Sequence, residues 1–415
     1  MIKAFLNIKI KGGALQFVLF IAVLIAILLA AFISLSHVHT LFKKQSNLVV
    51  QTVKEGDNRL FASLENKQGI LSLENEDNIT NSNWGVFEKL TVVSTAKKYS
   101  FTKTALNGGQ VKERTALYLK ESHQPLILVG NTRIEGRAFL PKQGARAGNI
   151  SGKSYYGSSL IYGSVNESTD KLPLLEDTFK HKLDSFMETG GSNNTELISG
   201  EANTSIRNSF KKPTRLMYLG ERIDLDGIEL VGNIIVRSEQ KIRVGTSAVL
   251  KDIILIAPEI EIEAGVKGNF QAFATKNISV GKNCELSYPT ALVLNIKIQA
   301  DQDPNKEKRQ IFLDQSASVK GIIAQFGTAG ERNFKPQVVI EENALIEGEV
   351  YCEARMELKG SVYGSVFTSG FVSNQAGSVY LNHIFNGKII AAALTDQYAG
   401  LAFSGTKKNI VKWLY

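Results

Sequence analysis

The sequence predicts a mainly β protein: a parallel β-helix with coils of about 18 residues and a helical insertion, preceded by one N-terminal transmembrane helix. Two patterns predict this fold class. Residues 12–36 form one uncharged apolar stretch, and pairs of apolar residues recur within residues 242–358 at a step of 18. The chain has 415 residues, 43% of them hydrophobic, which is enough for one large elongated domain.

The stretch 12–36 is rich in Leu, Ile, Val, Ala and Phe. At about 1.5 Å per residue it exceeds the bilayer core of about 30 Å, so it predicts a transmembrane helix. A cleaved secretory signal is the alternative, but its apolar region usually has only about 7–15 residues. The short basic leader, residues 1–11, contains Lys3, Lys9 and Lys11, and Lys43 and Lys44 follow the helix. This small bias favours a cytoplasmic leader, with the bulk of the chain on the other side.

The next two regions are less regular. Residues 37–83 predict a membrane-proximal helix and a linker, which ends in the turn-rich tract ENEDNITNSN. Residues 84–140 contain short alternating runs such as KLTVVST, which predict a small β region. A first, isolated coil is expected in LILVGNTRIEGRAFL, with inward residues Leu126, Leu128, Thr132, Ile134 and Ala138.

Residues 223–377 are predicted to form the β-helix. Each coil opens with two apolar residues separated by one other residue: Ile242/Val244, Ile260/Ile262, Ile278/Val280, Ile296/Ile298, Val338/Ile340 and Met356/Leu358. A shorter step of six occurs inside the coils, as in Ile340, Ile346, Cys352 and Leu358 with Ala344 and Val350, and in Val244, Leu250, Ile256 and Ile262 with Ala248 and Ile254. Three such steps make one coil with three short faces, and a coil can bury its apolar face only against its neighbours, at a spacing of about 4.8 Å.

Residues 141–222 are expected to interrupt the coils as an insertion. It contains an amphipathic helix, with Leu172, Leu175, Phe179, Leu183 and Phe186 near one face, and a mobile loop in GGSNNTELISGEANTS. Two shorter loops are expected at Ala300–Gln310 and Phe326–Gln337. Residues 378–415 lose the period and are predicted to form a C-terminal cap on the last coil.

The segments IEGEV and KGSVYGSV resemble the apolar–x–Gly–x–apolar rhythm of the bactofilins, bacterial β-helix proteins that form polymers. They also resemble hexapeptide-repeat acyltransferases. The N-terminus is similar to type IV prepilins and pseudopilins, in which a peptidase would cut after Gly12. That family usually has Glu at the fifth mature position, where this chain has Phe17. The resemblances imply a bacterial envelope protein, and an uncleaved anchor remains the plain interpretation of the N-terminus.

Candidate chemistry is sparse. Acyl transfer would use a His base, but the five histidines, His37, His39, His123, His181 and His383, all lie outside the regular coils. Glu259, Glu261 and Glu263 share one strand face and suit either Ca²⁺ or a solvated surface, of which the second is favoured. Asp301 and Asp303 are expected to be solvated. Cys284 and Cys352 fall on coils too far apart for a disulfide, so we expect buried thiols.

The sequence therefore predicts no catalytic, cofactor or metal site. Its net charge of +8 is spread over short doublets such as Lys211-Lys212, which argues against nucleic acid as a partner. We expect a single-pass protein of the bacterial inner membrane with its bulk in the periplasm. Its expected role is a structural scaffold of an envelope, secretion or pilus-like assembly, with protein partners or self-assembly. The alternative is an envelope protein that binds or cleaves polysaccharide.

Overall fold

The computed structural model describes residues 12–65, 79–189, 195–198, 204–218, 220–297, 309–327 and 334–414. The chain divides into two compact units. One consists of Met1–Arg59 and Val92–Thr102, and the other of Leu60–Thr91 and Lys103–Tyr415. Helix α1 and strands β2 and β3 contribute residues to both units. The basic leader, residues 1–11, lies outside the described residues.

The first unit is built around α1 (Gly12–Leu64), a continuous helix of 53 residues. It is long and apolar enough to cross a membrane. Neither Gly nor Pro interrupts it between Gly13 and Gly56, which explains why the predicted transmembrane and membrane-proximal helices are one element. Its residues 13–47 are exposed, and burial begins on one face at Leu48 and Thr52.

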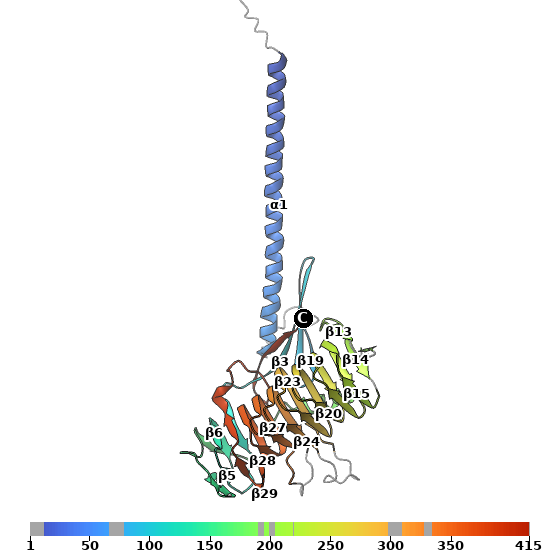
Figure 1. Cartoon of the computed structure of the whole chain (residues 1–415). Helices are drawn as coiled ribbons and strands as arrows, with labels where there is room; N and C mark the ends of the chain where they lie inside the picture. Colours follow the sequence, from blue (N-terminus) through green and yellow to red (C-terminus); the bar gives the residue numbers. More distant parts are fainter. Residues whose placement is uncertain are drawn as a thin grey trace, which may run out of the picture. The chain divides into compact units, whose positions relative to one another are not determined.

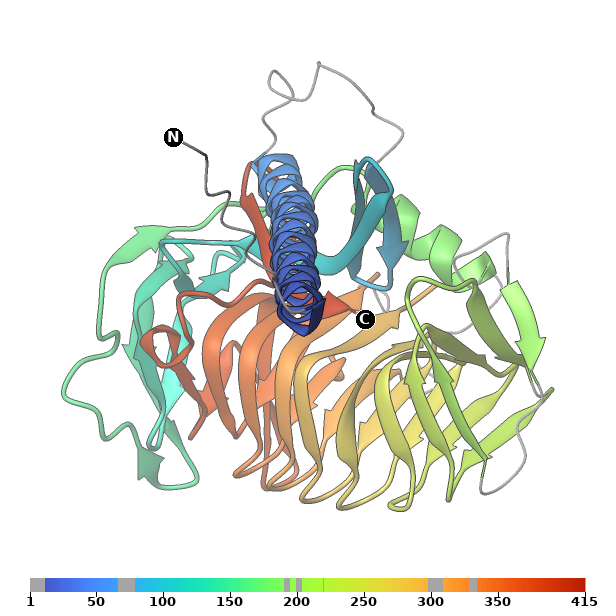
Figure 2. The ribbon, with the colours of Figure 1, turned by 90° about the horizontal axis from the view of Figure 1, so that it is seen from above.

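The second unit consists mainly of parallel strands that lie side by side in three rows (Figures 1 and 2). The first row is formed by short strands with a constant register. It runs through β15 (Arg222–Leu225), β18 (Lys241–Val244), β20 (Glu259–Ile262), β22 (Asn277–Val280), β24 (Gln310–Leu313), β26 (Val338–Ile340) and the end of β27 (Leu345–Leu358).

Each apolar residue of the first row stands beside its equivalent in the next strand. The two ladders are Ile223, Ile242, Ile260, Ile278, Ile311, Val338, Met356 and Leu225, Val244, Ile262, Val280, Leu313, Ile340, Leu358. Every one of these side chains is buried. The 18-residue step is thus confirmed from Ile242 to Ile278 and from Val338 to Met356, because residues one step apart occupy the same place in neighbouring strands.

The pair Ile296/Ile298 was wrongly predicted to open a coil. The strand that follows β22 in this row is β24, with Ile278 opposite Ile311. Ile296 instead follows β23 (Glu285–Asn295) and donates its backbone N–H to the carbonyl of Phe326 at 2.9 Å. The predicted loop Ala300–Gln310 comes before the next first-row strand rather than after it, and residues 298–308 lie outside the described part of the chain.

The second and third rows share long strands. The second row runs through β13 (Ser205–Asn208), β16 (Glu229–Gly232), the first residues of β19 (Val249–Ile256), β21 (Lys267–Ala274), β23, β25 (Ser318–Phe326), β27 and β28 (Ser361–Gln375), then β31 (Lys388–Ile390) and β6 (Arg133–Glu135). The third row runs through β12 (Thr195–Ile198), β14 (Thr214–Tyr218), β17 (Ile234–Arg237), the later residues of β19 to β28, then β4 (Thr115–Leu119), β7 (Arg137–Leu140) and β11 (Val165–Glu167).

A bulge in β19 changes which residues point inward. Asp252 has φ 62°, and the pairing with β21 shifts register between Lys251 and Ile253. Ile253 and Leu255 therefore join the core between the rows, whereas Ile254 and Ile256 pack in a second cluster on the outer side. The sequence ladder had placed Ile254 and Ile256 inside; one extra residue reverses the facing of all that follow it.

The N-terminal strands lie beside the C-terminal ones. Strand β28 pairs with β4, and β31 pairs with β6, so the segment 115–167 continues the rows beyond residue 390 (Figure 2). The residues predicted to point inward in a first coil, Leu126, Leu128, Thr132, Ile134 and Ala138, are all buried. The tail was expected to cap the last coil, but it contributes only β31 beside β28, and β4, β6 and β7 continue the rows beyond.

Smaller pairings complete this end of the rows. β30 (His383–Phe385), β5 (Leu126–Val129) and β8 (Ala145–Ala147) are parallel, whereas β9 (Asn149–Ile150) with β10 (Lys153–Ser154) and β28 with β29 (Ser378–Leu381) are antiparallel. The predicted insertion 141–222 is thus interrupted by strands of the rows. Part of its expected mobile loop is strand β12, and residues 190–194 and 199–203 lie outside the description.

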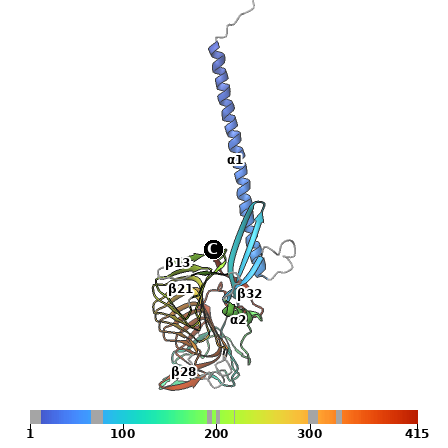
Figure 3. The same cartoon turned by 90° about the vertical axis from the view of Figure 1, so that its right-hand side faces the viewer.

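The outer side of the third row is covered by α2 (Phe179–Thr189) and a four-stranded sheet (Figure 3). The sheet contains β1 (Ile79–Trp84), β2 (Phe87–Ala96), β3 (Tyr99–Gln110) and β32 (Lys407–Leu414) in that order. Phe186 of α2 packs on Phe273, with ring centroids 5.7 Å apart. The predicted helix is confirmed at Phe179, Leu183 and Phe186, but Leu172 and Leu175 precede it, because the backbone at Leu175 forms a bridge with Phe403.

Three glycines allow neighbouring strands of the second row to approach. Gly321, Gly348 and Gly364 lie opposite one another, with φ values of 142°, 153° and 143°. A Cβ on Gly348 would lie 1.8 Å from the carbonyl oxygen of Gly321. The apolar–x–Gly–x–apolar rhythm thus places glycine where backbone contact excludes a side chain.

We therefore expect Gly348→Ala to destabilise the second unit by about 3 kcal/mol, since it adds both a clash and an unfavourable φ. Gly144→Ala is the matched control, because Gly144 also has positive φ (66°) but faces open space. Thermal unfolding of the full chain in detergent, followed by circular dichroism, measures both. Equal losses in the two variants would show that the close approach is unimportant.

Candidate functional site

A surface pocket of the second unit has a volume of about 650 Å³. It lies on the second unit where β23, β25 and β27 meet β32 and the segment 394–398. Its lining is mixed: aromatic Tyr288, Tyr398 and Trp413, an ion pair between Lys320 and Glu347, and the polar side chains of Thr395, Gln397, Asn409 and Lys412. The lining thus combines aromatic surface with donors and acceptors of hydrogen bonds.

The walls of this pocket are held by buried tyrosine hydroxyls. Tyr398 donates to the carbonyl of Gly321 at 2.9 Å, and Tyr288 donates to the carbonyl of Ala399 at 2.7 Å. The two rings lie 5.5 Å apart. Burial raises the pKa of both hydroxyls. Both tyrosines therefore act as neutral donors that attach the segment 394–401 to the rows.

Glu349 is a buried carboxyl in the same region. Its residue is 4% exposed, and it accepts the backbone N–H of Leu401 at 2.7 Å. Burial raises its pKa to about 7, against the lowering effects of that hydrogen bond and of the charge on Arg114. Arg114 itself donates to the carbonyls of Leu394 and Thr395. A carboxyl that can hold a proton near neutrality is a candidate acid, but Glu349 does not line the pocket.

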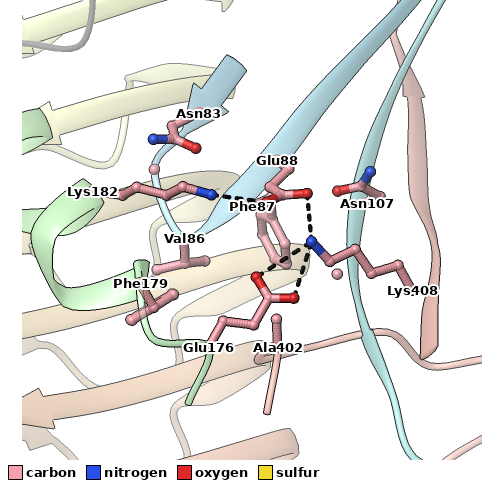
Figure 4. Close-up of a pocket in the computed structure, with 12 residues that line it drawn as sticks. Asn83, Val86, Phe87, Glu88, Asn107, Glu176, Phe179, Lys182, Ala402 and Lys408 are labelled. Atoms are coloured by element: carbon pink, nitrogen blue, oxygen red, sulfur yellow. Dashed lines mark hydrogen bonds and ion pairs between the residues drawn. The ribbon is translucent and has the colours of Figure 1, made fainter. Parts of the chain in front are cut away.

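An ion cluster lies in a smaller cavity of about 20 Å³, lined also by Phe87 and Phe179 (Figure 4). Glu88 accepts bonds from Lys182 at 3.1 Å and from Lys408 at 2.8 Å, and Lys408 also pairs with Glu176 at 3.0 Å. Burial alone raises the pKa of Glu88, but the two lysines lower it below its ordinary value. The acids and bases compensate each other, and the cavity has room for about one water.

The cluster joins three segments that are distant in the chain. Glu88 belongs to β2, Lys182 to α2 and Lys408 to β32, and Glu176 precedes α2. Two acids and two bases in alternation leave no unmatched charge for a ligand. We interpret the cluster as a structural clip between the four-stranded sheet and α2.

The residues singled out in the sequence do not converge. Among the described residues, no group of three or more His, Cys, Asp or Glu side chains is suited to hold a metal ion. Glu261 pairs with Lys241 at 2.5 Å, and Glu263 pairs with Arg243 across neighbouring strands. The histidines stay dispersed over α1, the loop at His123, α2 and β30. Asp301 and Asp303 lie outside the described residues.

Both cysteines are free and buried, as expected. Cys284 donates to the carbonyl of Glu263 at 2.9 Å, and Cys352 to Oε1 of Gln325 at 3.4 Å. Burial raises the pKa of Cys284 and brings that of Cys352 to about 12. These thiols are therefore poor nucleophiles.

No pattern in the sequence indicates the pocket. Its residues come from β23, β25, β27, the segment 394–398 and β32, which no spacing rule connects. The tail KKNIVKWLY supplies several lining residues of the pocket, but its sequence predicts only a cap. Comparison of the chain with protein-family models, curated proteins and solved structures gives no match.

The raised pKa of Glu349 predicts that stability depends on pH. Its pKa rises from an ordinary 4.5 to about 7 on folding, so between these values the folded chain holds a proton that the unfolded chain has released. Stability is therefore greatest below the unfolded pKa and falls by about 3 kcal/mol as the pH rises through 7.

Denaturant unfolding of the full chain in detergent at pH 5 and pH 8 measures this effect. Glu349→Gln is the matched control, because its amide oxygen can still accept the N–H of Leu401 without a titratable proton. We expect the wild-type chain to lose about 2.5 kcal/mol more than Glu349→Gln between the two pH values. An identical pH dependence of both proteins would contradict the role of Glu349.

The ion cluster predicts that Lys408→Met destabilises the chain by about 2 kcal/mol, because Glu176 and Glu88 then lose a shared partner. Lys388→Met serves as the control, since Lys388 is exposed and its loss should cost less than about 0.5 kcal/mol. Chemical denaturation of both variants gives the comparison. If Lys408→Met lowers the free energy of unfolding no more than Lys388→Met, the ion cluster does not stabilise the contact between the four-stranded sheet and α2.

Proposed function

We propose that this chain is a membrane-anchored structural protein of the bacterial cell envelope. In this proposal α1 crosses the inner membrane once, and the second unit lies in the periplasm as part of an envelope, secretion or pilus-like assembly. The observation that carries it is the exposed apolar surface of α1 over residues 13–36, in the same chain as the long parallel rows. Such a surface requires a lipid or protein environment.

We further propose that the three rows are the faces of one parallel β-helix. The support is the register: residues such as Ile242, Ile260 and Ile278 lie opposite one another, and the interior between the rows holds one continuous apolar core. Repeats of this kind make a unit in which each layer is stabilised by its neighbours. A rod of this type suits a load-bearing or spacing role.

Self-assembly is proposed on the resemblance to the bactofilins. The aligned glycines Gly321, Gly348 and Gly364 underlie that resemblance, because the rhythm IEGEV surrounds Gly348. Cleavage after Gly12, as in type IV prepilins, is the proposed alternative to a retained anchor. The two proposals differ in the first residue of the mature chain.

A second candidate is an envelope protein that binds or cleaves polysaccharide. The pocket with Tyr288, Tyr398 and Trp413 favours it, because aromatic rings beside polar groups suit the apolar faces and hydroxyls of sugars. Binding of an envelope polysaccharide that is lost in Trp413→Ala would support this candidate over the scaffold.

Protease accessibility tests the proposed topology. In a bacterial host with two membranes, we expect protease to reach the segments after Lys44 only once the outer membrane has been opened. The mass of the recovered N-terminus is read in the same samples. Retention of Met1 supports a permanent anchor, and a start at Gly13 supports processing as in pseudopilins.

Resistance to protease in spheroplasts would contradict the periplasmic location. Solubilisation with detergent then provides the control, because the same segments must become cleavable when the membrane is removed. A chain that resists only in intact spheroplasts would be a cytoplasmic, membrane-tethered element.

A further inference from the structure

The turn between β2 and β3 presents two exposed lysines. Lys97 and Lys98 form the two-residue connection, and Tyr99 follows with its ring 5.4 Å from the Lys98 ammonium. The segment 92–102 contains no acidic residue. The tip of this hairpin is therefore positively charged, with an amphipathic ring beside the charge.

Lysine is an unexpected residue for this turn. Lys97 has φ 54°, a conformation for which two-residue hairpin turns prefer Asn or Gly. The backbone alone would favour those residues. A lysine at this position thus points to a use for its charge.

The hairpin is attached to α1 within the first unit. Ser94 Oγ donates to the carbonyl of Thr52 at 2.8 Å, and a Cβ on Gly56 would lie 3.0 Å from the same oxygen. From this contact the hairpin extends along α1 toward the N-terminal end of the helix (Figures 1 and 3). The three residues from Ser94 to Lys97 add about 10 Å, which equals about seven residues of helix.

The tip therefore lies level with the helix segment between Gln45 and Leu48. Burial supports this position, because Leu48 is the first partly covered residue of α1 and residues 13–47 are exposed. The helix carries its own charges just before this level, at Lys43 and Lys44. Its first acidic residue is Glu55, so basic side chains dominate this section of the unit.

This level is close to the expected membrane surface. The uncharged stretch ends at Ser36, and the headgroup layer extends about 5–7 Å beyond the hydrocarbon core. Lys43 and Lys44 then lie at or just above the headgroups. The tip of the hairpin lies about 10 Å above the headgroups, which is about one Debye length at physiological salt, and an extended lysine side chain brings its ammonium closer to them.

We propose that Lys97 and Lys98, together with Lys43 and Lys44, bind anionic phospholipid headgroups of the membrane that α1 crosses. This inference rests on the proposed anchor and adds a second, electrostatic contact with a lipid surface. Each lysine near an anionic surface favours the contact about fivefold, so the two hairpin lysines together favour it about 30-fold. The contact would hold the hairpin at the bilayer, and it would weaken at high salt.

The test uses the full chain in nanodiscs of phosphatidylcholine alone or with about 30% phosphatidylglycerol, a fraction chosen to give an anionic surface. A fluorophore on Ser100→Cys, an exposed site beside the tip, reports its access to aqueous iodide. The native cysteines are buried, and unlabelled background is measured on the chain without Ser100→Cys. We expect the anionic lipid to reduce iodide quenching, and high salt to restore it.

Three variants separate charge from other effects. Lys97→Asn with Lys98→Gln removes the charge and keeps a residue suited to the turn, so it should abolish the protection. Lys97→Arg with Lys98→Arg should retain it. Lys282→Gln with Lys388→Gln changes the net charge equally at exposed positions of the second unit and should leave it unchanged.

Three different outcomes would overturn the inference. If the chain enters nanodiscs but quenching is the same in both lipids, the hairpin does not bind the surface while the anchor stands. If the chain does not co-purify with nanodiscs, the anchor fails and the lipid contact fails with it. Protection that survives in Lys97→Asn with Lys98→Gln would also exclude these lysines as its cause.

Discussion

The register between parallel strands is the constraint on which the second unit depends. Each backbone hydrogen bond between neighbouring strands of a row also fixes which side chains lie beside each other, so Ile242, Ile260 and Ile278 form one ladder because their strands are aligned residue for residue. A shift of one residue would turn the whole inward set outward. Apolar burial and hydrogen bonding therefore select the same arrangement, and neither is available to a single strand alone.

The same constraint explains the departures from regularity. The bulge at Asp252 turns Ile254 and Ile256 toward the outer side, where α2 and the four-stranded sheet cover them. Aromatic residues such as Phe186 and Phe273 fill that outer cluster. The outer side of the third row is thus a second core, and the half-buried ion cluster around Glu88 lies within its covering layer. The charged groups of this cluster are paired with one another.

Strands from residues 115–167, and not a separate cap, follow the C-terminal strands of the rows. Strands from residues 115–167 extend the rows beyond β28 and β31, which protects edges that would otherwise be open to pairing with other chains. The tail is then free to pair with β3 through β32. That arrangement brings Trp413, Tyr398 and Tyr288 around one pocket and seals Glu349 beneath the segment 394–401. The pocket is thus a product of this closure.

The sequence by itself determined the apolar length of α1, the mainly β character, the parallel 18-residue register from Ile242 to Ile278 and the buried state of both cysteines. These follow from local composition and from periods that repeat along the chain. Only the tertiary structure decided the register between Ile278 and Val338, the inward set of β19, the pairing of β4 with β28, and the pocket. An insertion, a one-residue bulge and a contact between distant residues leave no period in the sequence. Each is selected by packing against a partner that local patterns do not specify.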